Sequence, residues 1–299
     1  MNRLAVESLL QTNPDAEITI HYQDPPDNEH WRALESKVEL RAIDLPGLLS
    51  GLPPSMTSVV PVLEGISSGY LAGRSNILRY LILYREGGIY LDFDTLTVKD
   101  YLPLLAYPGF IGEEAVFRYD DDRVSGKFPL GLIPAGACFG MSYYLSLLNC
   151  RYLGDSSALN GINKTLMSMW SERKLNNAVL ACEVGSPFFA KAIALVSETN
   201  PGIKYALGPI LMNRTWSTEA AQHMQRLGTE YFYAIPPSQT FRFFYGPAVP
   251  LPSSAYSIHW CSSNHKALAS TLTLENLGKA SSSPTLFHKL AYEVIRKGL

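Results

Sequence analysis

One segment, residues 70–94, limits the folds open to this chain more than any other. Apolar residues recur at helical spacing from 70 to 84, and Gly87-Gly88 then supplies residues that accept a positive φ and end a helix. The apolar run Ile89-Tyr90-Leu91 is too short for a helix and is predicted to be a buried strand. It ends in Asp92-Phe93-Asp94. This order predicts two carboxylates at the C-terminal end of a central strand, where open α/β sheets bind ligands.

The remaining sequence alternates between strand and helix patterns, which favours a layered α/β fold. Strands are expected at 17–22, 38–43, 177–182 and 256–260. Helices are expected at 6–11, 31–36, 187–197, from Gly208-Pro209 towards Leu227, and at 285–297. Residues 1–276 are expected to form one domain, with a linker at 277–284 and a closing helix completing residues 277–299.

Composition excludes several classes of protein. The 299 residues carry a net charge of −2, which does not favour general nucleic-acid binding. The sequence contains no run of about 18 consecutive apolar residues, so no membrane-spanning helix is predicted. Residues 1–11 do not have the pattern of a signal peptide. The four cysteines are scattered without a C-x-x-C pair, so we expect reduced, mostly buried thiols. A cytoplasmic location is expected, or a soluble part of a longer protein.

The acidic pair Asp92 and Asp94 is a candidate metal site. In an extended backbone both carboxylates point to one side of the strand and Phe93 to the other. Two hard oxygen donors suit Mg²⁺ or Mn²⁺, which favour an oxygen-rich partner such as a diphosphate. The alternative is a solvated turn with two acids, which is common for an isolated D-x-D tripeptide. Two other acidic clusters, Glu113-Glu114 and Asp120-Asp121-Asp122, are expected in a solvated loop.

Three nearby stretches resemble the sugar-binding region of DXD-motif glycosyltransferases. They are Gly73-Arg74-Ser75-Asn76-Ile77-Leu78-Arg79-Tyr80, Leu83-Tyr84 and Gly87-Gly88-Ile89-Tyr90-Leu91-Asp92-Phe93-Asp94. The sequence is most similar to the α-1,4-galactosyltransferase and initiating α-1,6-mannosyltransferase families, and more distantly to the glucosyltransferase domains of clostridial toxins. Weaker similarity, extending over residues 5–262, includes Val6-Glu7-Ser8-Leu9, Asn177-Ala178-Val179-Leu180-Ala181, Ser186-Pro187-Phe188, Gly208-Pro209 and Tyr256-Ser257-Ile258-His259-Trp260.

The resemblance implies a GT-A type fold, with a mixed sheet flanked by helices in a single catalytic domain. It also implies a nucleotide-sugar donor, a divalent metal (Mn²⁺ or Mg²⁺) and roles for particular residues. Asp94 would bind the metal directly, and Asp92 would hold the metal, its water or a sugar hydroxyl. His259 would approach the metal or the diphosphate, and Arg79 would lie near the donor sugar or phosphate. Further substrate contacts are expected from Asn76, Asn177 and Trp260.

The sequence departs from these families at three points. Asn76 replaces the usual aspartate, and Trp260 follows His259 one residue earlier than in the galactosyltransferases. These families begin with a strand of the type Ile-Pro-x-x-Ile-His near the nucleotide base, and nothing before Met1 supplies it. We therefore expect either truncation at the N-terminus or another segment in that place. A degenerate domain that binds a nucleotide sugar or a partner without catalysis is the alternative function.

By resemblance, the chain is expected to be a metal-dependent, retaining hexosyltransferase. A UDP-hexose is favoured over GDP-mannose as donor, and the acceptor is a glycan, a lipid-linked sugar or a protein. Surface polysaccharide synthesis is the favoured role, and an effector that glycosylates a host protein is the variant left open. Association with a membrane surface, secretion and a lumenal fragment remain alternatives to a simple cytoplasmic location.

Overall fold

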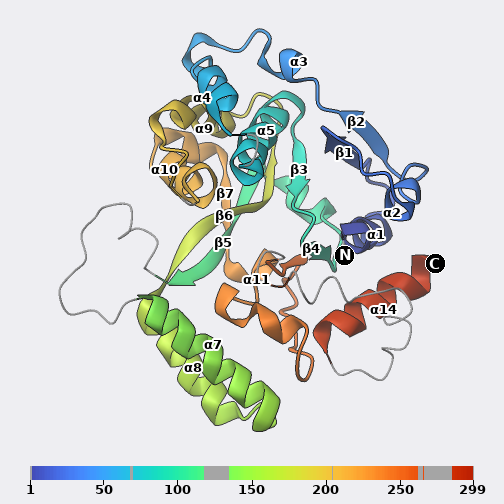
Figure 1. Cartoon of the computed structure of the whole chain (residues 1–299), viewed down its shortest axis with the longest axis vertical. Coiled ribbons are helices and arrows are strands. Elements are labelled where there is room, and N and C mark those ends of the chain that lie inside the picture. Colours follow the sequence, from blue (N-terminus) through green and yellow to red (C-terminus); the bar gives the residue numbers. More distant parts are fainter. Residues whose placement is uncertain are drawn as a thin grey trace, which may run out of the picture.

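The protein folds around a four-stranded mixed sheet flanked by helices (Figure 1). The computed structural model describes residues 2–67, 70–117, 135–203, 205–261, 265 and 285–298. The strand order is β3-β6-β5-β7, where β3 is Gly88–Leu91, β5 is Gly109–Phe117, β6 is Ser171–Cys182 and β7 is Gln225–Leu227. Strands β3 and β5 run antiparallel to β6, whereas β7 runs parallel to β5. The predicted α/β architecture with a mixed sheet is therefore confirmed.

Two smaller sheets complete the strands of the described residues. Strand β1 (Thr19–Tyr22) pairs in parallel with β2 (Glu39–Ala42), which confirms the first two predicted strands. Strand β4 (Thr95–Thr97) pairs antiparallel with β8 (Ser257–His259), the strand predicted near the C-terminus. The second pairing joins segments that lie far apart in the sequence, and it has a direct consequence for the site described below.

The helices cover most of the remaining described chain. They are α1 (Asn2–Thr12), α2 (Glu29–Arg32), α3 (Leu45–Leu49), α4 (Val59–Gly65), α5 (Leu71–Glu86), α7 (Ala135–Tyr152), α8 (Ser157–Trp170), α9 (Pro187–Leu195), α10 (Leu211–Trp216), α11 (Thr229–Phe232) and α14 (Leu286–Gly298). Short 3₁₀ turns are η1 (Pro54–Met56), η2 (Leu102–Ala106), η3 (Val196–Glu198), η5 (Glu219–His223) and η6 (Pro237–Phe243), and η4 (Ala206–Ile210) is a π-helical turn. None of the helices in the described residues is both long and apolar enough to cross a membrane.

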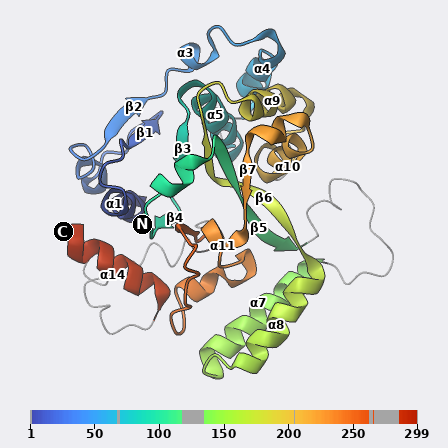
Figure 2. The same ribbon diagram turned by 180° about the vertical axis from the view of Figure 1, so that it is seen from behind.

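The sheet is buried on both faces because its inner strands alternate between two apolar clusters. Leu180 and Ile111 face the cluster formed with helices α4, α5, α9 and α10. Val179 and Phe110 face the opposite cluster, which includes Phe232 of α11. Side chains at successive strand positions point to opposite faces, so each buried strand supplies both clusters. Figure 2 shows the sheet from behind, with α9 and α10 beside its upper part and α11 near its lower part.

Helix α5 leads directly into strand β3, as predicted. Ile77, Tyr80 and Leu81 of α5 are fully buried in the cluster against α9, where Tyr80 stacks on Phe189. Gly87 ends the helix with φ of 68° and ψ of −156°, a conformation open essentially only to glycine. The glycine therefore fixes the angle at which the chain enters β3 and reaches the acidic pair.

Three expectations are corrected by the structure. The helix predicted from Gly208-Pro209 towards Leu227 ends at Trp216, because residues 225–227 pair with β5 as strand β7. Strand β3 was expected to be a buried central strand, but it is half-buried and lies at the edge of the four-stranded sheet. Within the described residues of that sheet it pairs with β6 alone. Glu113-Glu114 is buried in β5 rather than in a solvated loop. The other acidic cluster, at 120–122, lies outside the described residues.

The predicted closing helix is confirmed as α14, and it packs against the N-terminal helix. Gln11 Nε2 donates to the Val294 carbonyl at 2.6 Å, and Phe287 packs against Phe243 and Phe244. The linker expected at 277–284 lies outside the described residues, and the division at residue 276 stays a prediction. The cysteines whose side chains are described, Cys150, Cys182 and Cys261, are free thiols as expected, but only Cys182 is buried, which corrects the expectation that most are buried.

Gly87→Ala is expected to lower the free energy of unfolding by about 2–4 kcal/mol. An added Cβ would lie 2.9 Å from the Val184 nitrogen and 3.1 Å from the Cys182 carbonyl oxygen, at a φ that strains any side chain. Gly88→Ala is the matched control, because φ there is also positive but no atom lies within 4 Å of the added Cβ. Urea denaturation measures both variants, and equal losses would contradict the importance of this contact.

Candidate functional site

The acidic pair lies in a tight turn that joins β3 to β4. The Asp92 carbonyl accepts hydrogen bonds from the Thr95 amide at 3.0 Å and from Thr95 Oγ1 at 2.7 Å. The extended backbone predicted for these residues is therefore wrong, because the chain reverses immediately after β3. The two carboxylates nevertheless stay together, with 26% of the Asp92 side chain and 17% of the Asp94 side chain exposed. They remain accessible from solvent while their backbone is fixed.

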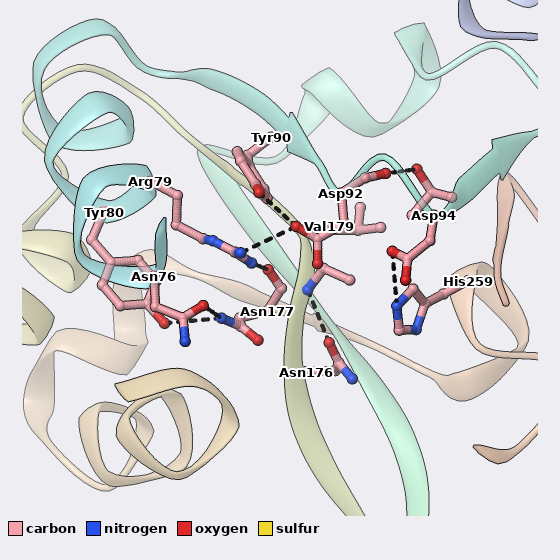
Figure 3. Close-up of polar contacts among 12 residues, drawn as sticks. Asn76, Arg79, Tyr80, Tyr90, Asp92, Asp94, Asn176, Asn177, Val179 and His259 are labelled. Atoms are coloured by element: carbon pink, nitrogen blue, oxygen red, sulfur yellow. Dashed lines mark hydrogen bonds and ion pairs between the residues drawn. The ribbon is translucent and has the colours of Figure 1, made fainter. Parts of the chain in front are cut away.

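His259 reaches the acidic pair through the pairing of β4 with β8. Thr95 stands opposite His259 in that ladder, and the Trp260 amide donates to the Asp94 carbonyl at 3.0 Å. His259 Nε2 consequently lies 3.2 Å from Asp94 Oδ1, as Figure 3 shows. One ligand atom each from Asp92, Asp94 and His259 lie within 4.8 Å of one another. The structure thus brings the three predicted metal-binding residues together.

Arg79 is buried beneath this turn and is paired with Asp92. Its Nη2 lies 3.1 Å from Asp92 Oδ1, and its Nη1 donates to the Asn177 carbonyl at 2.5 Å. The guanidinium stacks over the Tyr90 ring at 4.5 Å, and Tyr90 Oη donates to the same Asp92 oxygen at 2.5 Å. Burial opposes the charged form of Arg79, but the charge of Asp92 raises its pKa above the ordinary value. Arg79 is therefore held as a cation beside the acidic pair.

Burial also raises the pKa of Tyr90 well above its ordinary value, so this phenol stays protonated and donates to Asp92. Two donors thus converge on one carboxylate oxygen, while the Asp92 amide donates to the Ala178 carbonyl at 2.9 Å. Arg79 Nε is buried and has no hydrogen-bond partner among the described residues. The side chains of Arg79 and Tyr90 therefore determine the orientation of Asp92 from the protein side.

Asn76 and Asn177 form a second polar group on the same side of α5. Asn177 Nδ2 donates to Asn76 Oδ1 at 2.9 Å and to Tyr80 Oη at 3.2 Å. Tyr80 Oη in turn donates to the Leu207 carbonyl at 2.9 Å. The Asn177 side chain is buried, so it holds α5 and β6 together, while the half-buried Asn76 is the more accessible of the two amides.

The two asparagines Asn176 and Asn177 lie within an irregularity in β6. Between the pairs Ile111–Leu180 and Glu113–Leu175, the chain advances two residues on β5 and five on β6. The extra length interrupts the normal alternation of side chains. Within this stretch the adjacent asparagines serve different parts of the site: Asn177 contacts Asn76, and Asn176 donates to Glu114 Oε2 at 2.6 Å.

Glu114 is the site residue that the sequence reasoning missed. Its Oε1 lies 3.9 Å from His259 Nδ1, on the other side of the imidazole from Asp94. Cys261 Sγ also lies 3.6 Å from His259 Nδ1, and ligand atoms of Glu114, His259 and Cys261 lie within 4.8 Å of one another. The apolar residues Phe110 and Ile111 near the start of β5 could have indicated a buried strand continuing through Glu114, and hence a buried carboxylate.

The two carboxylates flanking His259 favour the imidazolium form. Burial alone would lower the pKa of His259, but the neighbouring Cys261, Asp94 and Glu114 raise it well above its ordinary value. The protonated imidazole supplies the positive charge between these two carboxylates. The same atoms can therefore hold a metal ion once the proton leaves, because neutral imidazole and carboxylate are both metal ligands.

Trp260 does not lie where a substrate contact was expected. Its ring is only 3% exposed and packs edge-to-face against Phe244, in the cluster that includes Leu96 and Ile258. The structure therefore places the ring in the core, in correction of the expectation. Its backbone amide, which donates to the Asp94 carbonyl, gives Trp260 a positioning role instead.

The N-terminal part of the chain matches a known family. Residues 2–111 match a family model described as the glycosyltransferase sugar-binding region containing the DXD motif. The match includes Arg79, Asp92 and Asp94, and it ends before Asn177 and His259. It confirms, for this part of the chain, the resemblance predicted from residues 73–94.

Individual proteins similar to the chain include a fungal enzyme and solved glycosyltransferases. The chain is 30% identical over 132 residues to glucan organizing enzyme 1 of Cryptococcus neoformans var. grubii serotype A, which covers 44% of this chain and 31% of that protein. The PaToxG glycosyltransferase is 19% identical, with 72% of this chain and 61% of that chain covered and a TM-score of 0.38. The galactosyltransferase LgtC, solved with donor and acceptor sugar analogs, is 14% identical, with 99% and 91% covered and a TM-score of 0.41. The chain thus covers less than two thirds of the first two proteins.

Asn177→Ala is expected to lower the free energy of unfolding by about 1–3 kcal/mol, because it leaves buried polar partners on α5 without their donor. Asn76→Asp is the matched comparison, since a carboxylate oxygen there still accepts from Asn177 Nδ2. We expect a change of about 0.5 kcal/mol or less for Asn76→Asp. Thermal and urea unfolding test both. A large loss in Asn76→Asp with none in Asn177→Ala would contradict the assigned network.

Proposed function

We propose that this chain, whose residues 2–111 carry a glycosyltransferase sugar-binding region, is a metal-dependent, retaining hexosyltransferase. The donor is a nucleotide sugar, with UDP-hexose favoured over GDP-mannose. The acceptor is a glycan, a lipid-linked sugar or a protein, and surface polysaccharide synthesis is the favoured role. The bond between the sugar carbon and the diphosphate oxygen breaks, and its electron pair leaves with the nucleoside diphosphate. A bond from the sugar carbon to the acceptor oxygen forms, and the acceptor hydroxyl gives its proton to the departing diphosphate.

The observation that supports this proposal is the convergence of Asp92, Asp94 and His259 at the β3–β4 turn. Their ligand atoms lie within 4.8 Å of one another, and all three side chains reach solvent in part. Two hard carboxylate oxygens and one imidazole nitrogen form a donor set that fits Mn²⁺, and Mg²⁺ less well because it prefers oxygen ligands. The residues present are therefore suited to a divalent cation.

Asp92, Asp94 and His259 would hold this cation. When bound, the ion supplies positive charge that stabilises a departing diphosphate. The protein's own contribution is positioning: the β3–β4 turn fixes both carboxylates, and the pairing of β4 with β8 brings the imidazole to them. Because these backbone contacts exist before any ligand binds, little reorganisation is required at the moment of reaction.

Arg79 is the second source of positive charge in the proposal. Its guanidinium is buried and directed at Asp92 by a stack on Tyr90. A fixed cation beside the acidic pair can stabilise the charge that develops on the leaving diphosphate. Asn76, which is half-buried at the adjacent turn of α5, offers an amide for a sugar hydroxyl, whereas the buried Asn177 orients Asn76.

We expect the purified chain, incubated with a panel of UDP- and GDP-sugars, to release nucleotide from one donor only when Mn²⁺ is present. Asp94→Asn should reduce the release at least about 100-fold, because a neutral amide replaces the charged carboxylate that would bind the metal beside His259. Asp92→Asn also leaves Arg79 buried without its partner, so its folding is checked by circular dichroism. Asp24→Asn, an exposed acid in the loop after β1, is the control and should keep full activity.

The same panel separates the alternatives. Binding of UDP or GDP with Mn²⁺ but no release, even with added glycan or lipid-linked acceptors, would favour a non-catalytic nucleotide-sugar-binding domain. Absence of both binding and release with every nucleotide would refute the glycosyltransferase proposal for this chain. Release that is equal in EDTA and in Mn²⁺ would refute the metal dependence alone.

Glu114→Gln is expected to weaken Mn²⁺ binding about 10–100-fold, because the carboxylate beside the second nitrogen of a ligating histidine orients the ring and raises its basicity. Gln keeps an oxygen to accept from Asn176, so the fold should be retained. Glu113→Gln on the same strand is the matched control, since Glu113 pairs with Arg226 and Arg173 instead of His259. Isothermal titration calorimetry with Mn²⁺ measures both, and an equal effect would contradict the role of Glu114.

A further inference from the structure

Helices α7 and α8 form a hairpin that extends from the open end of β5 and β6. Figures 1 and 2 show it reaching away from the main sheet as a separate pair of helices. Only residues 153–156 join the two helices. This hairpin has no part in the site described above, and its distribution of polar and apolar residues is unusual.

The contact between the two helices includes five polar side chains beside the buried Met167 of α8 and the partly buried Phe139 of α7. Ser142 Oγ donates to Asn163 Oδ1 at 2.7 Å, and Asn163 Nδ2 donates to Ser146 Oγ. Asn149 Nδ2 donates to Asn160 Oδ1 at 3.1 Å. Ser142, Ser146, Asn149 and Asn163 are each 2% exposed or less. We call this set of five side chains the polar interface of the hairpin.

The outer surface of α7 is apolar. Met141, Tyr144, Leu148 and Tyr152 are 39%, 63%, 50% and 68% exposed, and they recur every three or four residues. That spacing places all four on one face of the helix. Ile162 of α8 adds a further exposed apolar side chain. The four residues of α7 form what we call the outer stripe.

The outer stripe departs from the pattern expected for a helix pair in water. A surface helix normally buries its apolar face and exposes polar residues. Helices surrounded by lipid associate through small and polar residues, because hydrocarbon offers their apolar side chains as good an environment as the protein does. The polar interface and the outer stripe together therefore match surroundings that are apolar.

A contact with the main body fixes the direction of the outer stripe. Asp155, in the hairpin turn, accepts from Arg242 Nη2 of η6 at 2.7 and 2.8 Å. Tyr143 of α7 packs edge-to-face on Phe241 of the same turn. The side of α7 that carries Tyr143 therefore faces the main body. The outer stripe, which includes Leu148, lies on a different side of the helix and is exposed.

The charges of the hairpin complement an anionic surface. Helices α7 and α8 contain no aspartate or glutamate, whereas Arg151 and Lys164 are both exposed. Asp155 in the turn is neutralised by Arg242. Basic residues beside exposed tyrosine and leucine are typical of segments that bind at the headgroup region of anionic bilayers.

We propose that the outer stripe of α7 inserts into the headgroup region of an anionic lipid bilayer and so holds the enzyme at a membrane surface. The insertion is shallow, because neither helix is long and apolar enough to cross. Leu148 and Met141 enter the apolar boundary, Tyr144 and Tyr152 lie at the level of the headgroups, and Arg151 meets their negative charge. The proposal does not depend on the identity of the donor or the acceptor.

A second copy of the chain is a weaker candidate for this surface. The stripe from Met141 to Tyr152 is about 17 Å long and about 10 Å wide, or roughly 170 Å². A stable protein interface needs about 800 Å² from each partner. The patch is therefore far too small for a dimer, although it suffices for reversible binding to a bilayer that supplies a continuous apolar phase.

Co-sedimentation of the full chain with vesicles tests the proposal. We expect binding to vesicles of phosphatidylglycerol and phosphatidylcholine, and weaker binding to phosphatidylcholine alone or in 0.5 M salt, since salt screens exposed charges. The triple variant Tyr144→Ser/Leu148→Ser/Tyr152→Ser should bind at least tenfold more weakly. Leu102→Ser/Leu105→Ser is the matched control, because these residues are equally exposed on η2 and should leave binding within twofold.

Three outcomes would overturn the proposal: no binding of the wild-type chain to either vesicle, equal loss in the η2 control, or a wild-type dimer in sedimentation velocity that the triple variant abolishes. Circular dichroism must show the variants folded. Where the triple variant is not folded, Leu148→Ser alone is used, with an expected loss of about threefold or more. Nucleotide release should be unchanged in every folded hairpin variant, which separates this proposal from the proposed activity.

Discussion

The ion pair between Arg79 and Asp92 is the interaction on which the site depends. It joins the middle of α5 to the end of β3, and the same guanidinium binds the Asn177 carbonyl of β6. A buried charge without a partner is costly, and loss of one member of such a pair typically costs about 3–5 kcal/mol. The pair therefore favours only those arrangements in which helix, strand and acidic turn meet at one point, and Tyr90 strengthens it by donating to Asp92.

The second constraint is the pairing of β4 with β8. The turn after Asp92 sends the chain into β4, and Thr95 of that strand stands opposite His259. The Trp260 amide extends the ladder to the Asp94 carbonyl, while its ring is anchored in the core against Phe244. Core packing more than 160 residues along the chain from the acidic pair thus sets the position of the imidazole. The tight turn at Asp92–Thr95 is essential to this position, because an extended chain through Asp94 would not place Thr95 opposite His259.

Local patterns were sufficient to predict the part of the site that lies within one continuous segment. Helical spacing, the glycine at 87 and the short apolar run predicted α5, its end at Gly87 and β3, because each depends on its own residues. His259 was predicted only through resemblance, since no local pattern shows that β8 pairs with β4. Glu114 was missed because a charged pair in sequence suggests solvent, whereas Arg226 and Asn176 compensate the two buried carboxylates. Strand β7 was read as helix because its pairing with β5 is a tertiary effect.

The charges of the site argue for the order in which its ligands assemble. Three carboxylates, those of Asp92, Asp94 and Glu114, surround one guanidinium and one imidazolium, which leaves one negative charge in excess. A nucleotide diphosphate approaching this cluster would be repelled, because partly buried charges are only weakly screened. A divalent cation that displaces the imidazole proton replaces one positive charge by two and removes the excess. On this argument the proposed donor binds only together with its metal, and Arg79 alone is insufficient because Asp92 already neutralises it.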